Sequence, residues 1–180
     1  MSHLDQQATS DPSTSAPTPD DRPLYRQVKV LTVSDGVIAG TRQDTSGEAL
    51  ERFLAEQGWS VVERRQVADG VGPVSTELMD MAEGFNGLVV TTGGTGFGPR
   101  DLTPEATLAV VERQAPGMAE AMRLSNDRGL GRLSRAVAGT RGQTLILNTP
   151  GSTKGAIETL ASVLDVVPHA VELLAGERPH

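Results

Sequence analysis

The sequence predicts an α/β protein in which a mostly parallel sheet carries helices on both faces. Runs typical of strands alternate with runs typical of helices along most of the chain, a pattern typical of parallel sheets. The run Leu88-Val89-Val90 is apolar and largely β-branched, as expected of a strand that is buried on both faces. Polar or glycine-rich loops follow several of the strand-like runs, and ligands bind at this edge of such sheets.

The first half of the chain is expected to alternate three strands with two helices. Thr45-Ser46-Gly47-Glu48 matches a capping box, and apolar residues follow at helical spacing until Gly58. The expected elements are, in order, a strand over 28–33, a helix over 45–58, a strand over 59–67, a helix over 73–83 and a strand over 88–92.

The second half of the chain is expected to be richer in helices and to contain one hairpin. Thr103 is suited to cap a helix, and Pro104 is suited to its first position, where no amide is needed. The expected elements are helices over 104–114 and 118–127 with a break at 115–117, hairpin strands over 135–138 and 143–148 with the turn at 139–142, a helix through 157–164 and a last helix from 168.

Residues 93–98, between the third strand and the next helix, hold four glycines and predict an anion site. Glycine permits positive φ and lets a ligand approach the backbone without meeting a Cβ atom. A helix N-terminus beside such a loop favours phosphate. The loop is not a Walker A loop, because the lysines Lys29 and Lys154 lie elsewhere. Rossmann spacing fails as well, because Pro99 and Asp101 stand where the helix should begin.

Asp69 and Asp101 are the candidate catalytic and metal-binding residues. Each follows a predicted parallel strand, so both are expected at one edge of the sheet, beside the phosphate site. Two carboxylates beside phosphate groups are typical of a Mg²⁺ site. The alternative is that each aspartate, like Asp35, only stabilises a turn, although Thr103 already supplies the cap next to Asp101. Ser152 is most simply a helix cap, and a cap can also face a ligand.

The composition excludes several classes of protein. The formal net charge of −7 over 180 residues argues against a nucleic-acid binder. The absence of cysteine excludes disulfides, cysteine–zinc sites and a cysteine nucleophile. No run has the length of a transmembrane helix and the N-terminus does not resemble a signal peptide, so a cytoplasmic protein without membrane contact is expected. Residues 1–26 are expected to be a disordered tail before a single domain over 27–180.

Three motifs, in this order, resemble the molybdenum-cofactor biosynthesis family. They are Thr-Val-Ser-Asp at 32–35, Thr-Thr-Gly-Gly-Thr-Gly at 91–96 with Arg-Asp-x-Thr-Pro-Glu at 100–105, and Leu-Asn-x-Pro-Gly-Ser at 147–152. The family includes the Mog-type molybdopterin adenylyltransferases, the MoaB-type proteins and the G domains of gephyrin. The resemblance covers about residues 28–174, with one departure, because Thr149 stands where leucine is more common.

The resemblance implies a three-layer α/β/α sandwich, a homotrimer and the transfer of AMP from Mg-ATP to the phosphate of molybdopterin. The adenylylated product would then pass to a molybdenum-insertion protein. The family's two essential aspartates match Asp69 and Asp101, as catalytic residues and ligands of Mg²⁺. The residues expected to bind ATP and molybdopterin are Ser34, Asp35, Gly93, Gly94, Thr95, Gly96, Arg100, Thr103, Pro104, Glu105, Gly151 and Ser152.

Two other functions fit the same resemblance. One is a MoaB-like protein that binds molybdopterin with little catalysis, and the other is an interaction scaffold, as in gephyrin. The presence of both aspartates favours the enzyme.

Overall fold

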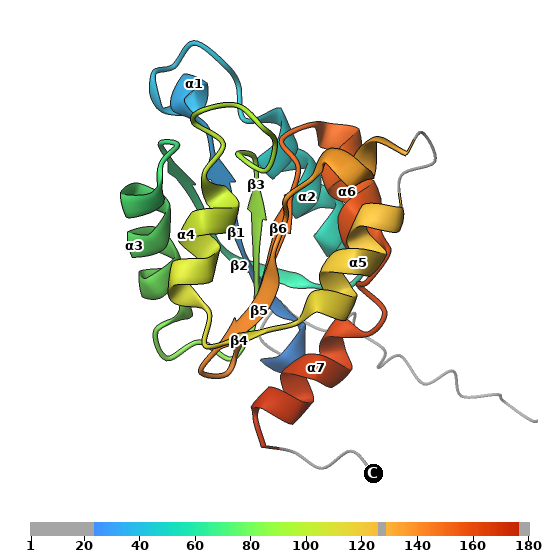
Figure 1. The fold of residues 1–180 in the computed structure, drawn as a ribbon. Coiled ribbons are helices and arrows are strands. Elements are labelled where there is room, and N and C mark those ends of the chain that lie inside the picture. Colours follow the sequence, from blue (N-terminus) through green and yellow to red (C-terminus); the bar gives the residue numbers. More distant parts are fainter. Residues whose placement is uncertain (1–23, 126–128, 177–180) are drawn as a thin grey trace, which may run out of the picture.

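The computed structural model describes residues 24–125 and 129–176, which form a six-stranded sheet in the order β2-β1-β3-β6-β5-β4. The strands are β1 (Gln27–Val33), β2 (Ser60–Val67), β3 (Gly87–Thr92), β4 (Arg113–Gln114), β5 (Ala138–Arg141) and β6 (Thr144–Thr149). The four strands β2, β1, β3 and β6 run parallel, and β5 and β4 continue the sheet antiparallel. The carboxyl ends of β1, β3 and β6 therefore lie side by side at one edge (Figure 1).

Helices cover both faces of the sheet, as Figure 1 shows, so the predicted three-layer sandwich is confirmed. One layer holds α3 (Val71–Ala82) and α4 (Thr103–Val110), and the other holds α2 (Thr45–Glu56), α5 (Pro116–Leu124) and α6 (Thr153–Ala161). The remaining helical segments are η2 (Leu24–Arg26), α1 (Asp35–Ile38), η3 (Leu130–Leu133) and α7 (Val167–Leu174). No helix among the described residues is long and apolar enough to cross a membrane.

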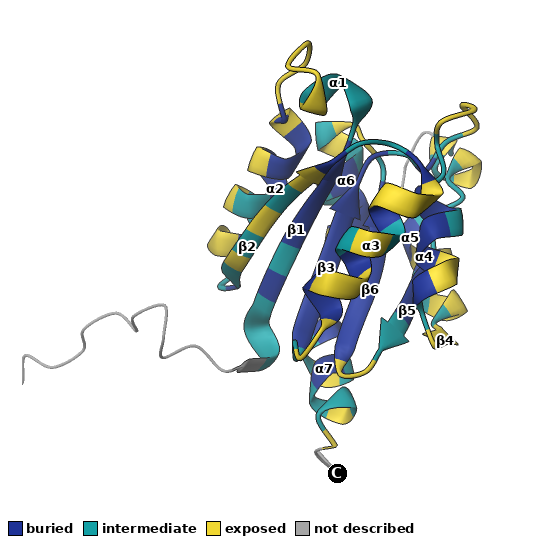
Figure 2. Cartoon of the chain, turned by 90° about the vertical axis from the view of Figure 1, so that its left-hand side faces the viewer, coloured by how far each residue is buried: buried dark blue, intermediate teal, exposed yellow. Residues whose placement is uncertain are grey.

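The central strands are largely buried, as their dark blue colour in Figure 2 shows. They separate two apolar clusters, one on each face of the sheet. Val28 and Val30 of β1 pack with the α2 and α6 layer, whereas Leu31 and Val33 pack with the α3 and α4 layer. In β3, Val90 packs with the α2 and α6 layer and Val89 packs with the α3 and α4 layer. The apolar run 88–90, which predicted a strand covered on both faces, is fully buried. Its side chains contribute to both apolar clusters.

The main error of the sequence prediction lies after α4. The helix predicted to reach residue 114 ends at Val110, and Arg113 and Gln114 pair with β5. The pairing depends on Gly139, where a Cβ atom would lie 2.7 Å from the carbonyl oxygen of Arg113. The sequence predicts Gly139 in the hairpin turn, but it lies inside β5, and the turn falls between Arg141 and Thr144. The hairpin itself is confirmed.

Smaller differences concern where elements begin. Helix α3 starts at Val71, two residues before the predicted start. The side chain of Asp44, not Thr45, caps α2 by accepting a hydrogen bond from the amide of Gly47. Residues 1–23 of the predicted tail lie outside the described residues, as do residues 126 and 127 at the end of the predicted helix 118–127.

Candidate active site

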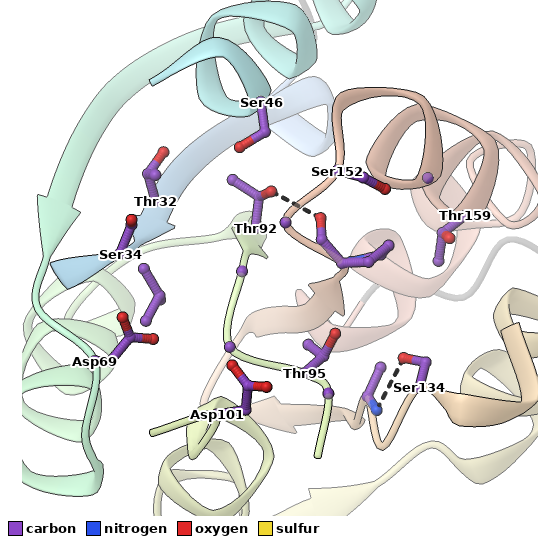
Figure 3. A pocket seen from close by; sticks show the side chains of 18 of the residues that line it. Thr32, Ser34, Ser46, Asp69, Thr92, Thr95, Asp101, Ser134, Ser152 and Thr159 are labelled. Carbon is purple, nitrogen blue, oxygen red and sulfur yellow. Dashed lines mark hydrogen bonds between the residues drawn. The ribbon is translucent and has the colours of Figure 1, made fainter. Parts of the chain in front are cut away.

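A pocket of about 660 Å³ opens where β1, β3 and β6 end (Figure 3), within the volume range usual for small-molecule sites. Its floor is the glycine-rich loop after β3. Its walls come from the segments that follow β1, β2 and β6 and from the start of α2. On the far side it is closed by α5 and η3, which contribute Met122, Arg123, Leu130 and Leu133. The pocket thus combines a polar end at the strands with a more apolar end.

The glycine-rich loop is held close to its neighbours, and this closeness requires glycine at Gly93 and Gly94. Their φ angles are 106° and 64°, in the region that favours glycine. A Cβ atom at Gly93 would lie 2.2 Å from the carbonyl oxygen of Val33. Thr103 donates its hydroxyl to the carbonyl of Gly93 over 3.0 Å, so the loop is anchored to the first turn of α4.

Asp69 is held by a reciprocal pair of hydrogen bonds with Asp35. The amide of Asp35 donates to Oδ2 of Asp69 over 2.7 Å, and the amide of Asp69 donates to Oδ1 of Asp35 over 3.0 Å. Arg100 binds both carboxylate oxygens of Asp35 over 2.9 Å and the carbonyl oxygen of Asp69 over 2.7 Å. Its hydrogen bonds lower the pKa of the Asp35 carboxyl below the ordinary value. We call these contacts among Asp35, Asp69 and Arg100 the Arg100 clasp.

Asp101 is held by its own loop. Its Oδ2 accepts a hydrogen bond of 2.8 Å from the amide of Gly98, and its amide donates to the carbonyl of Gly98 over 3.0 Å. A Cβ atom at Gly96 or Gly98 would come within 2.9 Å or 2.8 Å of the same oxygen. The two glycines therefore let the loop wrap around the carboxylate.

Asp69 and Asp101 both line the pocket (Figure 3), and each keeps one carboxylate oxygen without a hydrogen bond from the described residues. In each residue Oδ2 is occupied by a backbone amide, whereas Oδ1 accepts no hydrogen bond from any residue that the structure describes. The described residues contain no group of three or more histidine, cysteine or acidic side chains suited to a metal. Such a site suits Mg²⁺, which commonly takes one or two carboxylates and completes its shell with phosphate oxygens and water.

The segment after β6 closes the third side of the pocket. The hydroxyl of Thr92 donates to the carbonyl of Pro150 over 2.9 Å, which fixes this segment against the end of β3. Ser152 is the N-cap residue of α6, as predicted, but its hydroxyl makes no capping hydrogen bond with any described residue. The unusual Thr149 is buried and donates its hydroxyl to the carbonyl of Thr91 over 2.8 Å, so this departure leaves no unpaired hydroxyl.

The structure brings nine of the predicted site residues into the pocket and places five elsewhere. Those that line it are Ser34, Asp69, Gly93, Gly94, Thr95, Gly96, Asp101, Gly151 and Ser152. Asp35 and Arg100 belong to the clasp, and Glu105 pairs with Arg135, which lowers the pKa of its carboxyl. Thr103 and Pro104 are buried in the first turn of α4. The prediction of Thr103 as the N-cap is wrong, because Leu102 occupies that position.

Sequence reasoning missed the pocket wall that precedes and begins α2. Asp44 lines the pocket and is almost fully buried. Both of its carboxylate oxygens accept from the hydroxyl of Thr32 over 2.9 Å, and Oδ2 also accepts from the side-chain amide of Gln66 over 3.1 Å. Its position before a capping box was the available signal. The other missed lining residues include Arg42, Gln43, Ser46, Met122, Arg123 and Ser134.

Comparison with known proteins identifies the family of the chain. A family model described as "Probable molybdopterin binding domain" matches residues 29–169. The molybdopterin adenylyltransferase of Helicobacter pylori (strain J99) is 38% identical over 154 residues, covering 83% of this chain and 88% of the relative. The enzyme of the same name from Escherichia coli (strain K12) is 35% identical over 167 residues, covering 83% and 86%.

Among solved structures, the molybdopterin biosynthesis enzyme MoaB of Thermus thermophilus is 47% identical. It superposes with a TM-score of 0.78, and the match covers 84% of this chain and 97% of that protein. The region that the family model matches contains most of β1, the glycine-rich loop, Asp69, Asp101 and the segment after β6. The chain therefore belongs to the molybdenum-cofactor biosynthesis family, the family of the molybdopterin-binding domain.

Proposed function

We propose that this protein is a molybdopterin adenylyltransferase that transfers AMP from Mg-ATP to the phosphate of molybdopterin and releases pyrophosphate. The observation that carries the proposal is the pair Asp69 and Asp101 beside the glycine-rich loop in one pocket. Support comes from relatives of that name, which match more than four fifths of both chains.

The pocket is suited to two anionic substrates although the protein is acidic. Gly94 and Gly96 expose backbone to the pocket without a Cβ atom, whereas the amide of Gly93 already donates to the carbonyl of Thr149 over 3.1 Å. Ser152 stands at the N-terminus of α6. Backbone amides in both places favour phosphate groups. Arg42 also lines the pocket and would add positive charge. Arg123 lines the pocket too, but its Nη1 already donates to the carbonyl of Ala136 over 2.9 Å. We assign phosphate binding to the backbone amides and to Arg42 rather than to Arg100, whose guanidinium is engaged in the clasp.

The reaction forms a bond from a phosphate oxygen of molybdopterin to the α-phosphorus of ATP and breaks the bond to the departing pyrophosphate. The protein's part is to hold the two substrates in line. Asp69 and Asp101 would hold Mg²⁺ through their free Oδ1 atoms. When bound, the metal would neutralise charge on the triphosphate. No protein nucleophile is required, which agrees with the absence of cysteine from the chain.

We further propose a homotrimer that passes its product to a molybdenum-insertion protein. Light scattering on the purified protein is expected to give the mass of a trimer. A stable monomer at micromolar concentration would contradict this assembly.

The activity is tested by incubating the purified protein with molybdopterin, ATP and Mg²⁺ and analysing the products by mass spectrometry. Adenylyl-molybdopterin and pyrophosphate are expected in equal amounts. Tight binding of molybdopterin without either product would instead indicate a MoaB-like binding protein. Absence of both binding and product would favour a scaffold.

A further inference from the structure

Arg135 lies in a segment whose neighbouring side chains face the pocket, while its own guanidinium is bound to the backbone of the glycine-rich loop. Ser134 and Ala136 line the pocket, and the amide of Ala136 donates to the hydroxyl of Ser134 over 3.3 Å (Figure 3). Arg135, between them, is outside the pocket lining that the described residues form. A direct contact with substrate is therefore not its role in this structure.

The guanidinium of Arg135 joins the two ends of the loop that carries Asp101. Its Nε donates to the carbonyl of Gly96 over 2.7 Å, and its Nη2 donates to the carbonyl of Asp101. Its backbone amide donates to the carbonyl of Thr95 over 3.0 Å. Arg135 thus binds the loop both near its start, at Thr95 and Gly96, and at Asp101.

Two further contacts fix the guanidinium itself. Nη1 donates to Oε1 of Glu105, a residue of the first turn of α4. The Cζ atom of Arg135 lies 5.8 Å from the ring centre of Phe97, within the range of a cation–π contact. A planar guanidinium can make several such bonds in one fixed orientation, whereas a lysine ammonium cannot.

We propose that Arg135 is a positioning residue that holds Asp101 in the geometry needed for adenylyl transfer. The backbone of Asp101 is fixed by Arg135 at its carbonyl and by Gly98 at its amide. The carboxylate then keeps Oδ2 on the amide of Gly98, while Oδ1 accepts no hydrogen bond from the described residues, in a residue that lines the pocket. The role rests on the proposed function, because it acts through Asp101.

The kinetic test compares Arg135→Gln and Arg135→Lys with the matched control Arg141→Gln. Arg141 also donates to a backbone carbonyl, that of Val110, but lies outside the pocket lining among the described residues. Arg135→Gln is expected to lower kcat about 10- to 100-fold and to raise the Mg²⁺ concentration required, with KM for molybdopterin unchanged. The kcat of Arg135→Lys should lie between those of Arg135→Gln and the wild type, because lysine keeps the positive charge beside Glu105. The control Arg141→Gln should have the kcat and the Mg²⁺ requirement of the wild type.

A double-mutant cycle separates positioning from general stability. In an Asp101→Asn background, Arg135→Gln should cause little further loss, because the residue through which it acts is already disabled. The same further loss in both backgrounds, an unchanged kcat, or an effect confined to the KM for molybdopterin would each overturn the proposal.

A readout independent of activity is hydrogen exchange of the amides of Gly98 and Asp101. Arg135→Gln should speed their exchange about tenfold and leave the amides of β1 unchanged, because only the loop loses its anchor. Unchanged exchange at both amides would overturn the proposal even in an active enzyme. If the wild type forms no adenylyl product, the proposed function fails, while exchange still decides whether Arg135 holds the loop.

Discussion

Asp69 and Asp101 line the same pocket, and in each of them Oδ1 is the carboxylate oxygen without a hydrogen bond from the described residues. The two aspartates are nevertheless held by two different sets of contacts. Asp69 is fixed by the Arg100 clasp, in which the arginine and Asp35 side chains are 62% and 47% exposed. Asp101 is fixed by Arg135, which is 30% exposed and binds two backbone carbonyls as well as Glu105. Asp69 thus depends on an exposed arginine that binds the Asp35 carboxylate and one backbone carbonyl. Asp101 depends on a more covered arginine that binds two backbone carbonyls.

This difference indicates which of the two arginines, Arg100 or Arg135, can be substituted with the smaller loss of activity. Exposed ion pairs contribute little to stability and are screened by salt. Hydrogen bonds from a charged donor to backbone acceptors are stronger, and their loss leaves covered carbonyls unpaired. We therefore expect the Asp101 side of the pocket to depend more on its arginine than the Asp69 side does.

The largest effect is expected when the carboxylates themselves are changed. Asp69→Asn and Asp101→Asn should each lower kcat about a thousandfold, because each removes a charged ligand of the metal. If both hold one ion, the double variant should lose much less than the product of the two single losses. Steady-state kinetics at saturating ATP and Mg²⁺ measures this, and fully multiplicative losses would mean that the two residues act separately.

A smaller effect is expected from the arginine of the exposed clasp. Arg100→Gln should lower kcat only about threefold, because the reciprocal hydrogen bonds between Asp35 and Asp69 remain. The measurement is made beside Arg135→Gln under the same conditions. A larger loss for Arg100→Gln than for Arg135→Gln would reverse the comparison.

Salt should affect the two sides unequally. Coupling between Asp35 and Arg100, measured by a double-mutant cycle on the free energy of unfolding, should shrink between 0.1 M and 1 M ionic strength, where the screening length falls from about 10 Å to about 3 Å. Coupling between Arg135 and Glu105 should change less, because both side chains are more covered than their counterparts in the clasp. Equal salt dependence would contradict the distinction.

The smallest effect is expected at acid pH. Hydrogen bonds from Arg100 lower the pKa of Asp35 in the folded protein, so its contribution to stability is present above the unfolded pKa of about 3.9. That contribution is lost as the pH falls through the lower folded pKa. NMR titration should find the pKa of Asp35 below its ordinary value in the wild type and restored by Arg100→Gln. An identical titration in both proteins would exclude the clasp in solution.

Local patterns predicted the layers of the fold better than its edges. Alternating strand and helix signals, with buried runs such as 88–90, were enough to predict a mostly parallel sheet with helices on both faces. Strand β4 was missed because its pairing depends on a close approach to Gly139, which lies far along the chain.

The site shows the same limit. Asp69 and Asp101 could be found because each follows its own strand. Arg100 was interpreted as a phosphate contact because its partner Asp35 lies 65 residues away in the sequence. Arg135 was assigned only to a hairpin strand, since neither of its carbonyl partners has a local sequence signal.

The most direct test of the account is to measure molybdopterin binding and adenylyl transfer in parallel for the wild type and Asp101→Asn. Asparagine keeps the size of the side chain and can still accept from the amide of Gly98, but it removes the charge. We expect the variant to fold, to bind molybdopterin with the affinity of the wild type and to lose transfer about a thousandfold. Near-normal turnover at saturating Mg-ATP would reduce Asp101 to a turn residue, and loss of binding together with turnover would place it in the pterin site; either result would contradict the account.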